Sequence, residues 1–277
     1  MEVYEYGSGS PTVGIVGGIH GDEPETAEVV RQLVEEFERD EEPLNGTVKL
    51  IIANERALDA GVRYTDTDLN RVFPGNSNSN LYEERLAADI IDELRGLTAV
   101  LSLHSTHSAP PPFAISSNPD HSANRNTILS LPVEYVVDTS ALRNGSLDTQ
   151  IEQTVELEAG EQLTESVVEN GIVGSKNFLK AHNVLHNNVK HTNTRIVEVY
   201  EELEKQNGCP NVYYNNFEHI SEGTVIAEDD GIEHTAKTDK VTPVLMSEQG
   251  YEDIFGLLGE FSGTITPEEA QQRKSSN

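Results

Sequence analysis

The sequence predicts an α/β protein with a mixed central sheet flanked by helices and a small β-rich region near the C-terminal end. Short apolar runs, which are typical of buried strands, alternate with longer segments whose apolar residues recur at helical spacing. Such alternation is typical of a sheet covered by helices. After about His191 the pattern changes to short β-rich pieces separated by turns, which indicates a smaller second region.

The strand–helix alternation begins with a buried strand at 12–16 and a helix at 24–40. Pro24 suits the first turn of that helix. A strand at 47–53, a helix at 81–94 and a strand at 97–103 follow. The apolar residues of the two helices lie at helical spacing: Ala27, Val30, Leu33, Val34 and Phe37 in the first, and Leu86, Ile90, Ile91 and Leu94 in the second.

The remaining predicted elements have weaker patterns. Strands are expected at 133–137 and 154–158, and a long amphipathic helix is expected from Glu161. The Pro-rich stretch HSAPPPFAISSNP reads as a rigid loop, and AHNVLHNNVKH reads as part of a surface helix. The short β-rich pieces after His191 lie at 195–200, 212–214, 224–227 and 241–246.

The composition excludes several classes of protein. The 277 residues include 19 basic and 48 acidic side chains, which gives a net charge of −29 that repels nucleic acids and anionic membranes. No apolar run approaches the roughly 20 residues of a membrane span, and no signal peptide is apparent. A single cysteine, Cys209, rules out internal disulfides. We expect a cytoplasmic protein, and we hypothesise a halophilic one, because salt screens the repulsion between acidic groups.

A candidate metal site follows the first strand. The stretch VGGIHGDEPE places His20 three residues before Glu23, a spacing that lets one loop aim an imidazole and a carboxylate at one ion. Catalytic zinc takes three protein ligands and keeps one position for water. His104, directly after the strand at 97–103, is the natural third ligand. His107 is an alternative, and Glu23 would otherwise cap a helix or form a salt bridge.

The chain resembles the succinylglutamate desuccinylase/aspartoacylase family, a branch of the zinc carboxypeptidase-like hydrolases. The resemblance rests on G-x-H-G-x-E at 18–23, on the block ANERALDAGVRYTDTDLNRVFPG at 53–75, and on L-H-S-T at 103–106. It covers most of the chain, as far as the C-terminal stretch SEQGYEDIFG. It implies a zinc carboxypeptidase-like fold, with a zinc-hydrolase catalytic domain at 1–191 and a small β-rich domain at 192–262. A polar tail at 263–277 would complete the chain.

The resemblance also assigns roles to residues. It implies one zinc ion per chain, bound by His20, Glu23 and His104. Arg63 would polarise the scissile carbonyl and stabilise the oxyanion. Arg71 and Asn70 would hold the substrate carboxylate, for which the guanidinium is suited by its bidentate geometry, and Tyr251 would reach back to the substrate. The alternatives are surface ion pairs for the two arginines and packing for the tyrosine.

The family's general base is a glutamate on a strand ahead of a glycine, and the matching stretch is TVELEAGEQ. Glu156 fits best, by the Thr-Val that precedes it, and Glu158 is the alternative. Because alternate residues of a strand face the same way, both carboxylates point to the site or both point away from it. The competing interpretation of this stretch is a solvated acidic edge.

Three features depart from the family pattern. Ser102 replaces an aspartate that often lies two residues before the third ligand, the glycine after the base is two residues late, and the extra substrate-binding arginine has no clean match. Arg143 is the nearest candidate for that arginine, while Ser146 stands at the aligned position. These differences affect the side of the site that would bind the acidic part of a substrate.

The sequence thus predicts a zinc-dependent hydrolase of the amide bond in a small N-acyl amino acid, with neither nucleic acid nor membrane as partner. Two alternatives are a zinc carboxypeptidase that acts on peptides and a non-catalytic carboxylate-binding relative. The acyl group, the amino acid and the formation of a homo-oligomer are left open by the sequence.

Overall fold

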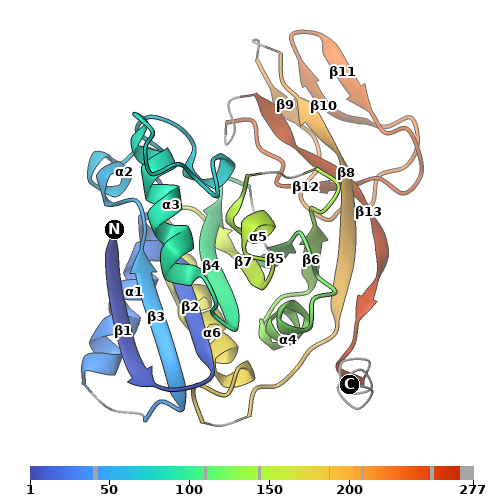
Figure 1. Ribbon diagram of the computed structural model, residues 1–277. Coiled ribbons are helices and arrows are strands. Elements are labelled where there is room, and N and C mark those ends of the chain that lie inside the picture. The colour runs from blue at the N-terminus through green and yellow to red at the C-terminus, as the bar shows by residue number, and fades with distance from the viewer. Residues whose placement is uncertain are drawn as a thin grey trace.

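The computed structural model describes residues 1–39, 43–108, 111–142, 145–186, 188–206, 209–249 and 253–268. Its central feature is a ten-stranded sheet (Figure 1). In spatial order the strands are β1 (Glu2–Ser8), β3 (Gly46–Ile52), β2 (Thr12–Gly17), β4 (Ala99–Thr106), β7 (Thr154–Glu161), β5 (Phe113–Ser116), β6 (Tyr135–Asp138), β8 (Thr194–Glu204), β13 (Ile254–Ile265) and β12 (Thr242–Val244).

The sheet is mixed, as the sequence predicts. Strands β3, β2, β4 and β7 are parallel to one another. Strand β5 is antiparallel to β7, and β5, β6 and β8 then run in a common direction. The outer pairs, β1 with β3 and β13 with β8 and β12, are antiparallel. The carboxyl ends of four parallel strands therefore meet at one edge, where α/β sheets commonly bind ligands.

Helices cover both faces of the sheet, with α1 (Pro24–Glu38) and α6 (Glu165–Ala181) behind it in Figure 1 and α3 (Tyr82–Leu94) in front. The remaining helices are α2 (Glu55–Ala60), α4 (Ser122–Ser130), α5 (Leu147–Gln150) and the 3₁₀ helix η1 (Leu69–Arg71). Within the part of the chain that the structure describes, no helix combines the length and apolar character needed to span a membrane.

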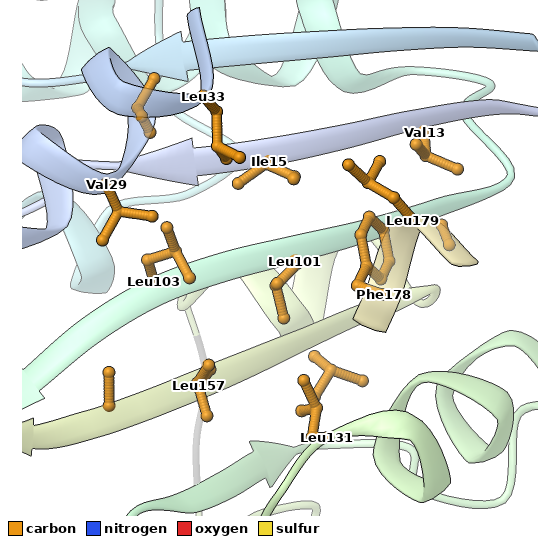
Figure 2. Packing of buried hydrophobic residues seen from close by; sticks show 14 of the residues in the cluster. Val13, Ile15, Val29, Leu33, Leu101, Leu103, Leu131, Leu157, Phe178 and Leu179 are labelled. Carbon is orange, nitrogen blue, oxygen red and sulfur yellow. The ribbon is translucent and has the colours of Figure 1, made fainter. Parts of the chain in front are cut away.

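Strand alternation assigns the two faces of β4 and β7 to different tasks. Leu101, Leu103 and Leu157 pack with residues of α1 and α6 in one large apolar core (Figure 2). The residues between them, including Ser102 and His104, must face the other side. On that side a second core packs α3 and α5 against the sheet. The polar side chains are therefore placed on the face that α3, α5 and η1 border.

A separate three-stranded antiparallel sheet lies near the C-terminal end, as the β-rich pattern predicts. It comprises β9 (Asn211–Val212), β10 (Val225–Asp229) and β11 (Ile232–Thr235). The pieces at 195–200 and 241–246 overlap β8 and β12, which belong to the large sheet instead. The division into domains at 191 and 192 stays a prediction.

Several local expectations are wrong. The Pro-rich stretch expected to be a loop contains β5, whose four residues are all buried. Strand β7 continues to Glu161, so α6 begins at Glu165 rather than at 161. The supposed surface helix around His182 is also incorrect, because α6 ends at Ala181. The His182 side chain is buried, with Nε2 2.8 Å from the Thr127 hydroxyl oxygen.

Candidate metal and catalytic site

The loop between β2 and α1 is shaped by close backbone contacts. Gly18 has a φ of +68°, in the left-handed region that favours glycine. A Cβ at Gly17 would lie 2.3 Å from the Thr26 carbonyl oxygen, and one at Gly21 would lie 2.1 Å from the Ala57 carbonyl carbon. The glycines let the chain turn tightly against α1 and α2, and this turn brings His20 and Glu23 together.

Two imidazoles and one carboxylate converge at the ends of β2 and β4. Candidate ligand atoms of His20, Glu23 and His104 all lie within 4.8 Å of one another. Glu23 stands between the rings, with Oε1 2.7 Å from His20 Nδ1 and Oε2 3.3 Å from His104 Nδ1. All three residues are at most 3% exposed. Two histidines and a glutamate are a donor set of catalytic zinc sites, so these residues fit a metal ion.

The charges of the cluster favour a cation at its centre. Burial opposes ionisation of Glu23, but the two imidazoles outweigh it and hold the pKa of this carboxyl well below its usual range. Burial also opposes the charged form of His104, yet the charge of Glu23 and its hydrogen bond raise the pKa of this imidazole to about 9. A proton on His104 thus supplies positive charge that a bound metal would supply instead.

Each histidine has a second polar partner on its far side. His20 Nε2 is 3.1 Å from Asp68 Oδ1, and Arg63 Nε donates to Asp68 Oδ2 at 3.0 Å. Burial opposes ionisation of Asp68, but His20 and then Arg63 lower the pKa of this carboxyl far below its usual range. His104 Nε2 is 3.1 Å from Ser102 Oγ. The serine that departs from the family pattern therefore still contacts the ligand, as a neutral group.

Asp68 is the residue of this site that sequence reasoning missed. The sequence signal was present, because Asp68 opens the D-L-N-R stretch that supports the family resemblance. The spacing gives no indication that it meets His20, which is 48 residues earlier. Partners of this kind fix the ring orientation of a metal-binding histidine.

Strand β7 brings both candidate bases into the same cavity. In the β4–β7 register, Ser102 is opposite Glu156 and His104 is opposite Glu158. The two carboxylates are 1% and 7% exposed, and both line the cavity that His20, Glu23 and His104 line. Neither glutamate forms a solvated acidic edge. Both line the cavity of the His20–Glu23–His104 cluster, and the preference for Glu156 stays a prediction.

Arg63, predicted to stabilise the oxyanion, and the predicted substrate-binding residues of η1 also reach the cavity. Arg63, Asn70 and Arg71 all line it, and Arg63 Nη1 also lies 3.7 Å from Glu23 Oε1. Asn70 and Arg71 belong to η1. Tyr251 and Arg143 lie outside the described residues. Ser146, at the position aligned with the family's extra arginine, is buried and donates to Asp148 Oδ1 at 2.5 Å.

His107, the alternative third ligand, lies apart from the cluster. It lines the cavity, but its Nε2 is 3.6 Å from Asp22 Oδ2 and a third of its side chain is exposed. Among the described residues, the group of metal-ligating side chains that converges is His20, Glu23 and His104. The structure therefore favours His104 as the third ligand, although it lies within β4 and not after it.

Comparisons with known proteins agree with this architecture. A family model described as the succinylglutamate desuccinylase/aspartoacylase catalytic domain matches residues 9–182, well over half of the chain. The succinylglutamate desuccinylase of Yersinia enterocolitica is 35% identical over 92 residues, which are 33% of this chain and 28% of that protein. A probable aspartoacylase of Prochlorococcus marinus is 34% identical over 104 residues, 33% of each chain. The matches thus span about a third or less of these relatives.

Solved structures are similar over almost the whole chain. Murine aminoacylase 3 has a TM-score of 0.75 at 20% identity, and the match covers 93% of this chain and 98% of that one. A succinylglutamate desuccinylase/aspartoacylase from Rhodobacter sphaeroides has a TM-score of 0.75 at 19% identity and covers 94% and 88%. At these identities the likeness establishes the fold, which confirms the predicted fold class.

Proposed function

Because the chain belongs to the succinylglutamate desuccinylase/aspartoacylase family, we propose that it hydrolyses the amide bond of a small N-acyl amino acid with one zinc ion per chain. The observation that carries this proposal is the convergence of His20, Glu23 and His104 in a cavity also lined by a buried glutamate and an exposed arginine. When bound, zinc lowers the pKa of a water ligand to about 7 and polarises a carbonyl oxygen.

The side chains of the cavity complete the reaction. Glu156 accepts a proton from the attacking water as the water oxygen bonds to the amide carbonyl carbon. It then gives that proton to the amide nitrogen as the carbon–nitrogen bond breaks, so the products are a carboxylic acid and a free amine. Arg63 donates hydrogen bonds to the carbonyl oxygen, where negative charge develops in the transition state.

The arginine of η1 orients the substrate. Arg71 is exposed and lines the cavity, so its guanidinium can meet the carboxylate of an incoming amino acid in bidentate geometry. We extend this role to Tyr251 from the family resemblance alone. Arg71 would thus bind the substrate carboxylate and Arg63 the oxyanion. Their positive charges also offset the negative charges of the buried glutamates.

A hydrolysis screen tests this proposal. Purified protein would be assayed against N-acetyl and N-succinyl amino acids and dipeptides, at high salt, with zinc added or removed by a chelator. We expect release of a free amino acid from an acylated substrate, loss of turnover on chelation and recovery with zinc. If the protein hydrolysed only peptides, it would be a carboxypeptidase and the proposed N-acyl amino acid hydrolysis would be wrong. A protein without stoichiometric zinc and without turnover would be a non-catalytic relative.

The net charge of −29 also underlies a proposal about conditions. We propose that the protein works in a high-salt cytosol, where counterions screen repulsion between its acidic groups. Its unfolding midpoint in urea should then rise with added potassium chloride. Full stability in dilute buffer would contradict a halophilic adaptation. Cytoplasmic location and homo-oligomer formation stay predictions.

A further inference from the structure

We propose that Asn70 is a positioning residue for the general base: its side-chain amide holds the Glu156 carboxylate in place for proton transfer. This inference rests on the proposed hydrolase function. It assigns to Asn70 a task beyond binding the substrate carboxylate, which is the task that the family resemblance implies. It depends on two hydrogen bonds of one buried amide and on the way η1 is anchored.

The orientation of the Asn70 amide is fixed by a backbone donor. The Leu147 N–H donates to Asn70 Oδ1 at 3.0 Å, so this end of the amide must be the oxygen. The nitrogen therefore faces the other way, and Nδ2 donates to Glu156 Oε1 at 3.1 Å. Asn70 is 3% exposed and Glu156 is 1% exposed. Because both side chains are buried, loss of either bond would weaken the restraint that holds the amide against the carboxylate.

The backbone that carries Asn70 is anchored on both sides. The Asn70 N–H donates to Asp68 Oδ1 at 2.9 Å, and the same carboxylate oxygen is 3.1 Å from His20 Nε2. The Phe73 N–H donates to the Gly145 carbonyl at 2.9 Å, and a Cβ at Gly145 would lie 2.3 Å from the Arg71 carbonyl oxygen. The segments around η1 and α5 are thus locked together, and the amide is held before any substrate arrives.

A fixed donor matters because proton transfer depends on geometry. A glutamate side chain has several rotatable bonds, and a base must lie within hydrogen-bond reach of the proton it takes. A displacement of about 1 Å in a reacting group can lower the rate about 10²-fold. The Asn70 amide restrains the Glu156 carboxylate, while the second hydrogen of Nδ2 still permits contact with a substrate.

The test separates positioning from substrate binding by splitting kcat from KM. Asn70→Asp keeps the acceptor for the Leu147 N–H and removes the donor to Glu156, and Asn70→Ser replaces the amide with a shorter hydroxyl, which removes the Nδ2 donor without adding charge. We expect both variants to lower kcat by about 10²-fold. For Asn70→Ser, kcat should fall by a much larger factor than the calorimetric affinity for the product amino acid, in which any contact of Asn70 with the substrate carboxylate would appear. Arg71→Ala should instead weaken product binding and raise KM. All variants should retain stoichiometric zinc.

The chain offers a matched control for a merely structural effect. Asn54 is also buried, and its Oδ1 accepts from the Ala57 N–H at 3.2 Å while its Nδ2 reaches Glu83 Oε1 at 3.4 Å. Asn54→Asp should lower the unfolding midpoint and leave the kcat of the folded protein unchanged. If Asn70→Ser keeps the wild-type kcat, or raises only KM, the positioning role is wrong. If wild-type protein turns over no acyl amino acid, the proposed function itself fails.

Discussion

Two buried glutamates, each contacted by a buried asparagine, serve different regions of this protein. Glu83, on α3, accepts hydrogen bonds from the backbone N–H groups of Thr65, Asp66 and Thr67 and from the Thr65 hydroxyl. Its partner Asn54 caps α2. Glu156, on β7, accepts from Asn70 and lines the cavity of the His20–Glu23–His104 cluster. The two sites share a residue pair but differ in what surrounds the carboxylate.

The difference shows how surroundings decide the task of a buried carboxylate. Backbone donors from 65–67 bind both oxygens of Glu83, so this side chain fixes the loop that leads to η1. Burial opposes its ionisation, but the hydrogen bonds from Thr65 and Asp66 outweigh it and lower the pKa. Glu156 instead shares a cavity with histidines and arginines, where a substrate can reach it. The Glu83 region thus supports the fold, whereas the Glu156 region has the surroundings that the proposed chemistry needs.

The largest expected effect is on turnover, from Glu156→Gln. The amide keeps the volume of the side chain and an oxygen that can accept from Asn70, but it cannot take a proton. We expect kcat to fall about 10³-fold with zinc content and unfolding midpoint near wild type. Steady-state kinetics and metal analysis measure this. Near-normal activity would transfer the role of base to Glu158, for which Glu158→Gln is the companion variant.

The corresponding change in the other region, Glu83→Gln, should act on stability. A glutamine would turn an NH₂ group toward backbone donors in a fully buried place, which leaves at least one hydrogen bond unmade. The expected loss is about 2–3 kcal/mol in the free energy of unfolding, measured with urea at high salt. The kcat of the folded protein should stay within a few-fold of wild type. A large loss of kcat with full stability would erase the distinction between the two regions.

A smaller effect is expected from Ser102→Ala. Ser102 Oγ is 3.1 Å from His104 Nε2, so we propose that the hydroxyl orients this proposed metal ligand as a neutral partner. Its removal should weaken zinc affinity about tenfold, as measured by competition with a chromogenic chelator. Ser175→Ala, at a buried serine of α6, is the matched control and should leave zinc affinity unchanged. Equal zinc affinity in wild type and Ser102→Ala would show that the contact does not support the ligand.

The sequence predicted the parts of the site that depend on local geometry. His20 and Glu23 lie on one turn, and strand alternation places Glu156 and Glu158 on one face, so both relations follow from spacing. The contacts of Asp68 with His20 and of Asn70 with Glu156 join residues 48 and 86 positions apart. Such contacts depend on how η1 packs against the sheet, which no local pattern records.

The fold was predictable to a similar extent. Strands β2, β3 and β4 have strong apolar runs because helices bury both of their faces. The prediction missed β1, whose residues alternate between partly buried and exposed at the edge of the sheet. It also missed β13, in which three glycines interrupt the apolar pattern. Four-residue β5 follows a Pro-rich stretch and is stabilised mainly by its neighbours in the sheet, so its own sequence gave no signal.

The last prediction concerns pH, on which the stabilising contributions of His104 and Glu83 depend with opposite signs in the metal-free protein. The pKa of His104 is raised to about 9 from its ordinary 6.5. Its contribution to stability is therefore full below pH 6.5 and is lost as pH rises through 9. The pKa of Glu83 is lowered, so its contribution is full above its ordinary 4.5 and is lost as pH falls through the lower folded value. Urea unfolding with a chelator across this range measures both limbs.

Two variants assign the two limbs of that stability profile. His104→Gln should flatten the alkaline limb of the chelated protein, and Glu83→Gln should reduce the acidic limb, to which Glu23 and Asp68 also contribute because their pKa values are lowered. Zinc should remove most of the alkaline limb in wild type, because the metal binds the neutral imidazole and takes the place of its proton. The salt concentration is held high and constant, so that repulsion within a chain of net charge −29 does not dominate the profile. An alkaline limb that persists in His104→Gln would mean that groups outside the metal cluster produce it.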